Sequence, residues 1–130
     1  MNEGEKKGKK VLLAEDDVFV SDVYSMRLQR EGYEVILARD GREALNQISE
    51  KIPDILLLDI MMPYMDGVEV LQEVKKKDDL KNIPVIMLTN LSEKENIEKT
   101  IEMGANDYLI KSHFTPSEVV EKVNGILSEK

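Results

Sequence analysis

The sequence predicts an α/β fold: a doubly wound five-stranded parallel sheet with helices on both faces. The sequence has five short runs of consecutive apolar residues. A strand with one face in solvent would alternate apolar and polar residues, so these runs are typical of parallel strands covered on both sides. A segment with helical spacing follows each run, and this strict alternation favours right-handed crossovers. The runs lie at residues 11–14, 35–38, 55–58, 85–88 and 108–110.

The first helix has an apolar stripe, and glycines end two of the helices. We expect Gly32 to end the first helix and Gly104 the fourth, because glycine readily adopts the left-handed conformation found after a helix. The stripe of the first helix consists of Val20, Val23, Tyr24 and Leu28.

Later helices begin with capping-box spacing, in which a short polar side chain and a glutamate three residues on satisfy free backbone N–H groups. In the last helix Thr115 is the cap, Pro116 the first helical residue and Glu118 the glutamate. Phe114 and Val119 are spaced to pack together across that helix start. The other pairs are Asp40–Glu43, Asp66–Glu69 and Ser92–Glu95.

Length and composition indicate one globular domain without thiol chemistry. We expect residues 1–9 to form a flexible basic tail and residues 10–130 to form the domain. The absence of cysteine excludes disulfide scaffolds, zinc–thiolate sites and thiol nucleophiles. The single histidine excludes histidine-rich metal sites.

Charge and hydropathy limit the kinds of partner. The formal net charge of −8, from 18 basic and 26 acidic residues, argues against direct binding of nucleic acid. No apolar run approaches the roughly 20 residues of a membrane-spanning helix, so we expect no membrane association. With no secretion signal in the sequence, we expect a cytoplasmic location.

Charged and hydroxyl side chains follow four of the five apolar runs. In open α/β sheets, ligands bind beyond the carboxyl ends of the strands, so these residues are expected at one edge. Each has an ordinary explanation when taken alone, as a helix cap, a turn former or a surface residue. Their joint placement favours a functional site. They are Glu15, Asp16 and Asp17 after the first run, Asp59 after the third, Thr89 after the fourth and Lys111 after the fifth.

Three of these carboxylates, those of Glu15, Asp16 and Asp59, are expected close to Lys111. One lysine does not neutralise three carboxylates, so the cluster needs a further positive charge or a proton. Two unit charges 4 Å apart repel by about 4 kcal/mol at an effective dielectric constant of 20, and a divalent cation or a raised pKa relieves the repulsion. Donors that are all oxygen favour Mg²⁺. A carboxylate screened in this way is able to attack phosphorus and form an acyl phosphate, with Lys111 and Thr89 stabilising the transferring oxygens.

With these residues in place, the chain resembles the receiver domain of two-component response regulators, of the stand-alone, chemotaxis-regulator-like kind. The resemblance extends from Lys10 over nearly the whole chain, and its most specific segment is PDILLLDIMMPYMDG at residues 53–67. The Glu15–Asp16 pair, the Leu88–Thr89 step, the turn at residues 104–108 and Lys111 occur in the expected order.

The resemblance implies a flavodoxin-like (βα)5 fold with strand order 2-1-3-4-5 and a role for each site residue. Asp59 is the implied phosphoryl acceptor, and the implied Mg²⁺ ligands are Glu15 (mostly through water), Asp16, Asp59 and the Met61 backbone carbonyl. Thr89 and Lys111 are the implied phosphoryl-binding residues, and Tyr108 the implied switch residue.

Two positions depart from the family pattern. Ser112 follows Lys111 where the family usually has proline after a cis peptide bond, which leaves open whether the Lys111–Ser112 peptide is cis or trans. Asn90 follows Thr89 where a small residue is common, so we expect Asn90 to restrict access to the site.

The resemblance also implies how such a chain works. A histidine kinase or phosphotransfer protein phosphorylates it, and it catalyses only its own phosphorylation and dephosphorylation. It signals to an output protein through the face formed by the fourth helix, the fifth strand and the fifth helix. We expect a monomer or a weak homodimer.

Three other functions are weaker matches to the sequence. A phosphohydrolase with an aspartate nucleophile typically needs a second aspartate two residues on, where this chain has Met61. An interaction module that works without phosphorylation would not need the carboxylates. A flavin-binding protein with the same fold would place Glu15 and Asp16 against the flavin phosphate, which they would repel.

Overall fold

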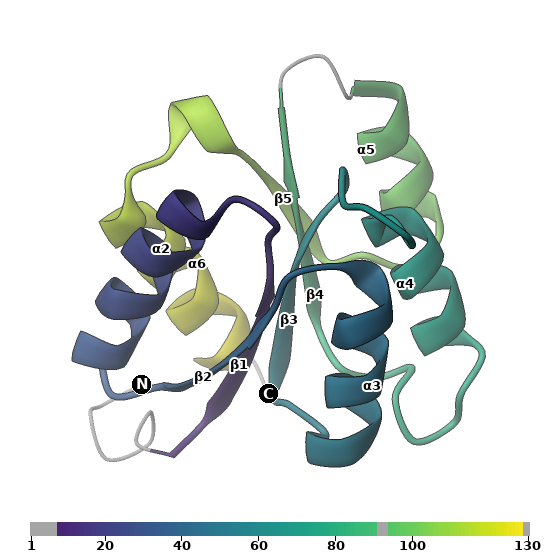
Figure 1. The fold of residues 1–130 in the computed structure, drawn as a ribbon, viewed down its shortest axis with the longest axis horizontal. Helices are drawn as coiled ribbons and strands as arrows, with labels where there is room; N and C mark the ends of the chain where they lie inside the picture. Colours follow the sequence, from purple (N-terminus) through teal and green to yellow (C-terminus); the bar gives the residue numbers. More distant parts are fainter. Residues whose placement is uncertain (1–7, 91–93, 129–130) are drawn as a thin grey trace.

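The computed structural model describes residues 8–90 and 94–128 (Figure 1). Parallel strands form one sheet in the order β2-β1-β3-β4-β5, as predicted. The predicted flexible tail lies mostly outside the described residues. The strands are β1 (Lys10–Ala14), β2 (Glu34–Ala38), β3 (Ile55–Asp59), β4 (Val85–Thr89) and β5 (Asp107–Ile110).

Helices cover both faces of the sheet (Figure 1). Alternate residues of each strand face opposite layers: Leu12 of β1 belongs to one hydrophobic core, and Val11 and Leu13 to the other. One face is covered by α2 (Val18–Arg30) and α6 (Pro116–Ser128), and the other by α3 (Gly41–Lys51), α4 (Gly67–Lys75) and α5 (Lys94–Glu102). A 3₁₀ turn, η2 (Lys111–His113), joins β5 to α6.

Most of the predicted helix ends are confirmed. Gly32 and Gly104 have positive φ angles of 106° and 107°, just after α2 and α5. The capping boxes Asp66–Glu69 and Thr115–Glu118 are complete. At α3 the box is only half formed, because the Glu43 carboxylate accepts from the Arg39 N–H and not from the cap residue. The predicted cap Ser92 lies outside the described residues.

The predicted apolar stripe of α2 is partly wrong. Val23 is 37% exposed, and the buried positions are Ser21, Tyr24, Ser25 and Leu28. These four positions have i, i+3, i+4, i+7 spacing, so they form one helix face. Two of them are serines, whose small side chains let the helix lie close to its neighbours but do not register as apolar. The helix is therefore rotated relative to the expectation, and Val20 lies at its edge, only half-buried.

In the part of the chain that the structure describes, no helix combines the length and the apolarity needed to cross a bilayer.

Two glycines let the loop after β3 pack closely against its surroundings. A Cβ atom on Gly67 would lie 2.2 Å from the Asp59 carbonyl oxygen, and one on Gly41 would lie 1.9 Å from the Met65 carbonyl oxygen. Backbone atoms cannot move away from such a close contact, whereas the end of a flexible side chain can. The loop that leaves Asp59 therefore depends on both glycines.

We predict that Gly67→Ala lowers the free energy of unfolding by about 1–3 kcal/mol, the usual effect of forcing a methyl group into a filled space. Gly125→Ala is the control, because Gly125 is exposed in the middle of α6 and an added Cβ would have nothing within 4 Å. That substitution should stabilise the protein by about 0.5–1 kcal/mol. Urea unfolding measures both effects, and equal stability of Gly67→Ala and wild type would contradict the packing argument.

Candidate functional site

The register of the parallel strands brings the ends of β1 and β3 together. Ala14 is the register partner of Leu58, so the next residues along the chain, Glu15 after β1 and Asp59 at the end of β3, lie side by side. The Glu15 N–H donates to the carbonyl of Ala38 on β2 at 3.0 Å, which extends the pairing past the last strand residue. Side chains from separate segments therefore meet at the carboxyl edge of the sheet, as the sequence predicts.

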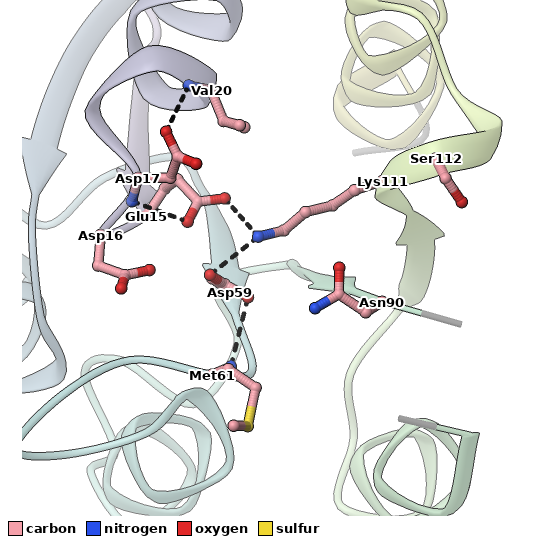
Figure 2. Close-up of a pocket in the computed structure, with 9 residues that line it drawn as sticks. All are labelled: Glu15, Asp16, Asp17, Val20, Asp59, Met61, Asn90, Lys111 and Ser112. Carbon is pink, nitrogen blue, oxygen red and sulfur yellow. Dashed lines mark hydrogen bonds and ion pairs between the residues drawn. The ribbon is translucent and has the colours of Figure 1, made fainter. Parts of the chain in front are cut away.

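Three of the predicted carboxylates form one cluster (Figure 2). Glu15, Asp16 and Asp59 each offer an oxygen, and these oxygens lie within 4.8 Å of one another. Glu15 is fully buried and Asp59 is 2% exposed, whereas Asp16 is exposed to solvent. The cluster thus has a buried side and an open side.

Asp17 has the structural role that its place before a helix predicts. Its carboxylate accepts hydrogen bonds from the N–H groups of Phe19 and Val20 at 3.0 and 3.2 Å, which caps α2. Its own N–H donates to Oε2 of Glu15 at 3.2 Å. Asp17 therefore orients Glu15 as well as the helix.

Lys111 reaches two of the three carboxylates. Its Nζ lies 2.5 Å from Oε1 of Glu15 and 3.0 Å from Oδ2 of Asp59 (Figure 2). The Lys111–Ser112 peptide is trans. The lysine therefore reaches the site without the cis peptide and proline that are usual in the family, from the first residue of the 3₁₀ turn η2.

The pKa values of the two buried carboxylates are shifted in opposite directions, that of Asp59 upward and that of Glu15 downward. Burial raises the pKa of Asp59, and the neighbouring Glu15 raises it further against the smaller opposing effect of Lys111. Burial also acts to raise the pKa of Glu15, but hydrogen bonds with Asp59 and Lys111 and the charge of Lys111 hold it below its usual range. The buried pair therefore favours one proton, on Asp59, until another positive charge is present.

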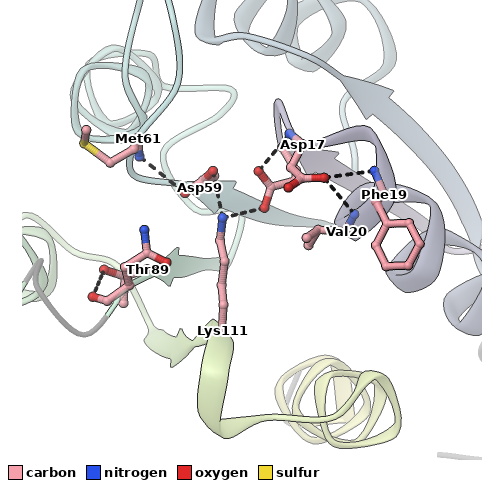
Figure 3. A network of polar contacts seen from close by, with 9 residues as sticks. Asp17, Phe19, Val20, Asp59, Met61, Thr89 and Lys111 are labelled. Atoms are coloured by element: carbon pink, nitrogen blue, oxygen red, sulfur yellow. Dashed lines mark hydrogen bonds and ion pairs between the residues drawn. The ribbon is translucent and has the colours of Figure 1, made fainter.

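Thr89 is placed near the site but its hydroxyl is occupied. Thr89 is 1% exposed at the end of β4, and its Oγ1 donates to the Asn90 carbonyl at 3.0 Å (Figure 3). Thr89 does not line the pocket above the carboxylates. The hydroxyl must leave this carbonyl before it can donate to a group bound at Asp59.

Three further predicted residues differ in how close they come to the site. The Met61 N–H donates to Oδ1 of Asp59 at 3.3 Å, which keeps the Met61 backbone beside the carboxylates. Asn90 is exposed and lines the pocket (Figure 2). Tyr108 is 39% exposed on β5 and does not line it.

The pocket also includes two residues that the sequence analysis did not assign to the site. Val20, near Asp17 on α2, and Ser112, next to Lys111, also line it (Figure 2). Val20 lies in the first turn of α2, directly after the acidic residues 15–17, so its place in the sequence was a usable signal. Ser112 was singled out only for the missing proline, and nothing in its residue type points to a pocket.

The arrangement has the parts that metal binding and nucleophilic chemistry require. The carboxylates are hard oxygen donors suited to a divalent cation such as Mg²⁺. Asp59 is a nucleophile candidate because its carboxylate faces an open pocket and has Lys111 on one side.

Known sequences agree with this description. A family model described as response regulator receiver domain matches residues 11–124. A probable transcriptional regulator of Guillardia theta is 40% identical over 118 residues, which cover 91% of this chain and 45% of that protein. Another from Cyanophora paradoxa is 39% identical over 92% of this chain and 48% of its own length. The chain thus spans about half the length of the curated relatives it matches.

Solved structures of receiver domains also have this fold. A receiver domain of a Francisella response regulator is 34% identical, with a TM-score of 0.85 over 94% of this chain and 98% of the other. A putative response regulator of Chloroflexus aurantiacus is 37% identical, with a TM-score of 0.87 over 94% and 99%. A chemotaxis response regulator of Vibrio cholerae is 33% identical, with a TM-score of 0.83 over 93% and 99%. The chain therefore belongs to the receiver domain family of two-component response regulators.

Proposed function

We propose that this chain accepts a phosphoryl group on Asp59 from a histidine kinase or a phosphotransfer protein, with Mg²⁺ as cofactor, and signals through the resulting change of its surface. The observation on which the proposal rests is the position of the Asp59 carboxylate, between Lys111 on one side and Glu15 and Asp16 on the other. On this proposal the chain is not an enzyme that turns over a separate substrate. It catalyses only its own phosphorylation and dephosphorylation.

Exposure and position in the chain favour Asp59 over its neighbours as the nucleophile. Both oxygens of Glu15 are engaged, Oε1 by Lys111 and Oε2 by the Asp17 N–H, and the side chain is fully buried. Asp16 is exposed and lies on the outer side of the cluster. Asp59 and Glu15 both contact Lys111 and line the pocket, and both oxygens of Asp59 also accept hydrogen bonds. The remaining exposure of the Asp59 side chain, 4% against 0% for Glu15, and its place in the segment at residues 53–67 support Asp59 as the nucleophile.

The proposed transfer balances without a further reactant. An Asp59 oxygen forms a bond to phosphorus while the phosphorus–nitrogen bond of the donor phosphohistidine breaks. The electron pair of the broken bond goes to the imidazole, which takes up a proton. Lys111 would donate to a phosphoryl oxygen, and Thr89 would do the same after leaving the Asn90 carbonyl.

The donor set fits Mg²⁺. Asp16, Asp59 and the Met61 carbonyl would hold the ion, with Glu15 acting mostly through water because its oxygens already bind Lys111 and Asp17. All donors are oxygens, and the exposed Asp16 leaves one side open for the waters that Mg²⁺ retains. The ion would supply positive charge that offsets the carboxylates and the transferring oxygens.

Phosphorylation would add negative charge where Lys111 and Thr89 are within reach, at the ends of β5 and β4. We propose that the signal leaves through the face of α5, β5 and α6, with Tyr108 as the switch residue, to an output protein and with at most weak self-association. Action as a stand-alone receiver stays a prediction, because the relatives named as transcriptional regulators are about twice as long.

We predict that a small phosphodonor with Mg²⁺ adds one phosphoryl group to the wild-type protein and none to Asp59→Asn, because the amide is a poor nucleophile. Intact mass measurement detects the adduct, and a chelator should abolish it. Asp22→Asn, which changes an exposed carboxylate on α2, is the matched control and should be phosphorylated normally. Continuous phosphate release would indicate a hydrolase instead, and no adduct with any donor would indicate an interaction module.

We predict that Mg²⁺ binding tightens as the pH rises. The pKa of Asp59 is raised, so at lower pH this carboxylate is protonated and a cation must displace the proton. At higher pH the proton is already lost and the competition ends. Calorimetric titration at several pH values measures the effect, and Asp59→Asn should bind more weakly with less pH dependence. Equal affinity of wild type at all pH values would contradict this.

We predict that Asn90→Ala speeds dephosphorylation by about twofold to fivefold, a change of under about 1 kcal/mol in the barrier. Asn90 lines the pocket beside Asp59, and a smaller side chain admits water more readily. The half-life of the phosphorylated protein after donor removal measures the effect. Asn46→Ala, at an exposed position of α3, is the control. An unchanged half-life would remove Asn90 as an access barrier.

A further inference from the structure

We propose that Arg42 and Tyr64 are positioning residues for the metal side of the site. In this proposal the guanidinium of Arg42 on α3 holds the ring of Tyr64, and so fixes the loop at residues 60–66 that includes Met61. The inference rests on the proposed function, because the metal in question is the Mg²⁺ proposed to bind at Asp16, Asp59 and the Met61 carbonyl.

The backbone of Tyr64 is unusual. Its φ angle is 68°, and among the described residues only Tyr64 and Ile52 have a positive φ without being glycine. A bulky side chain is unfavourable in this conformation, and such residues persist when their surroundings hold them. Burial does not hold this one, since Tyr64 is 75% exposed.

A contact with Arg42 restrains the side chain of Tyr64 in addition to its backbone turn. The guanidinium carbon of Arg42 lies 5.2 Å from the centroid of the Tyr64 ring, within the range of a cation–π interaction. Arginine suits this contact because its planar group stacks on an aromatic face and is always charged. The tip of the loop is thereby tied to α3.

The start of α3 also meets the loop through its backbone. Gly41, the first residue of α3, lies so close to Met65 that a Cβ would come within 1.9 Å of the Met65 carbonyl oxygen. Asp40 caps this helix end through the Glu43 N–H at 2.9 Å, which fixes the direction of the first turn. Arg42 therefore extends from a part of α3 that is already fitted against the loop.

The base of the same loop is bonded to the site. The Met61 N–H donates to Asp59, and the Gly67 N–H donates to the Ile60 carbonyl at 2.9 Å. Between these anchored ends, the Met65 N–H donates to the Pro63 carbonyl at 2.8 Å and makes a tight turn around Tyr64. A change at the tip therefore alters the turn that follows Met61, whose carbonyl is a proposed metal ligand.

A double-mutant cycle on Mg²⁺ affinity tests the proposal. Tyr64→Leu removes the ring but keeps a non-glycine residue at the same φ, and Arg42→Gln removes the cation. Each should weaken Mg²⁺ binding by about twofold to fivefold, as expected for loss of an exposed cation–π contact. The double variant should be little worse than either single one, because both remove one contact. Arg42→Lys keeps the charge but not the planar group that stacks on the ring, so its Mg²⁺ affinity should lie between those of wild type and Arg42→Gln.

Two further measurements separate positioning from charge and from global stability. Removal of a positive charge near an acidic site should by itself strengthen Mg²⁺ binding. Weaker Mg²⁺ binding by Arg42→Gln therefore has to come from the lost contact with Tyr64 and not from the lost charge. Arg30→Gln, at an exposed position at the end of α2, is the charge control. Amide exchange at residues 61–66 should become faster in Tyr64→Leu while exchange in β1 and β3 is unchanged.

The outcomes distinguish this inference from the function on which it rests. If the wild-type protein binds no Mg²⁺, the proposed cofactor fails. If wild type binds Mg²⁺ but both single variants retain its affinity, the proposed function stands and the positioning role is overturned. Fully additive effects in the double variant, or uniformly faster exchange throughout the sheet, would also overturn it.

Discussion

Negative charge is in excess at the carboxyl edge of the sheet, and the rest of the site depends on how the fold offsets it. Two buried carboxylates, Glu15 and Asp59, share one lysine, and a third carboxylate, Asp16, lies beside them. Such a cluster is unfavourable unless backbone donors, a proton or a cation offset it. The fold provides backbone donors from Asp17 and Met61. The remaining imbalance raises the pKa of Asp59 and makes the edge suited to a divalent cation.

Strand order explains why a lysine from the far end of the chain completes this cluster. In the order β1-β3-β4-β5, Lys111 follows β5 and reaches across the end of β4 to Asp59 on β3 and to Glu15 after β1. Thr89 ends the strand that the lysine crosses, and it is buried there. The peptide after Lys111 is trans, and the ammonium group still reaches both carboxylates.

Periodicity and strand-end position predicted the sheet, most of the helix ends and the residues that cluster at Asp59, because these follow from local sequence and from one rule of α/β topology. Tyr24 and Leu28 of the buried face of α2 were predicted, and Ser21 and Ser25 were missed because hydropathy gives no weight to serine. The occupied hydroxyl of Thr89 and the pocket position of Ser112 depend on side-chain directions and on distances between distant segments. Sequence spacing does not contain this information.

Asp59 contacts two different connecting segments at this edge. Its Oδ1 accepts from the Met61 N–H of the loop before α4, and its Oδ2 accepts from Lys111 at the turn before α6. A covalent group on either oxygen must alter at least one of these contacts. Lys111 also pairs with Glu15, so it keeps one carboxylate partner if its contact with Asp59 is lost. The loop has no such alternative partner for Met61 among its described contacts, and changes at Asp59 should therefore reach the loop as well as the β5 side.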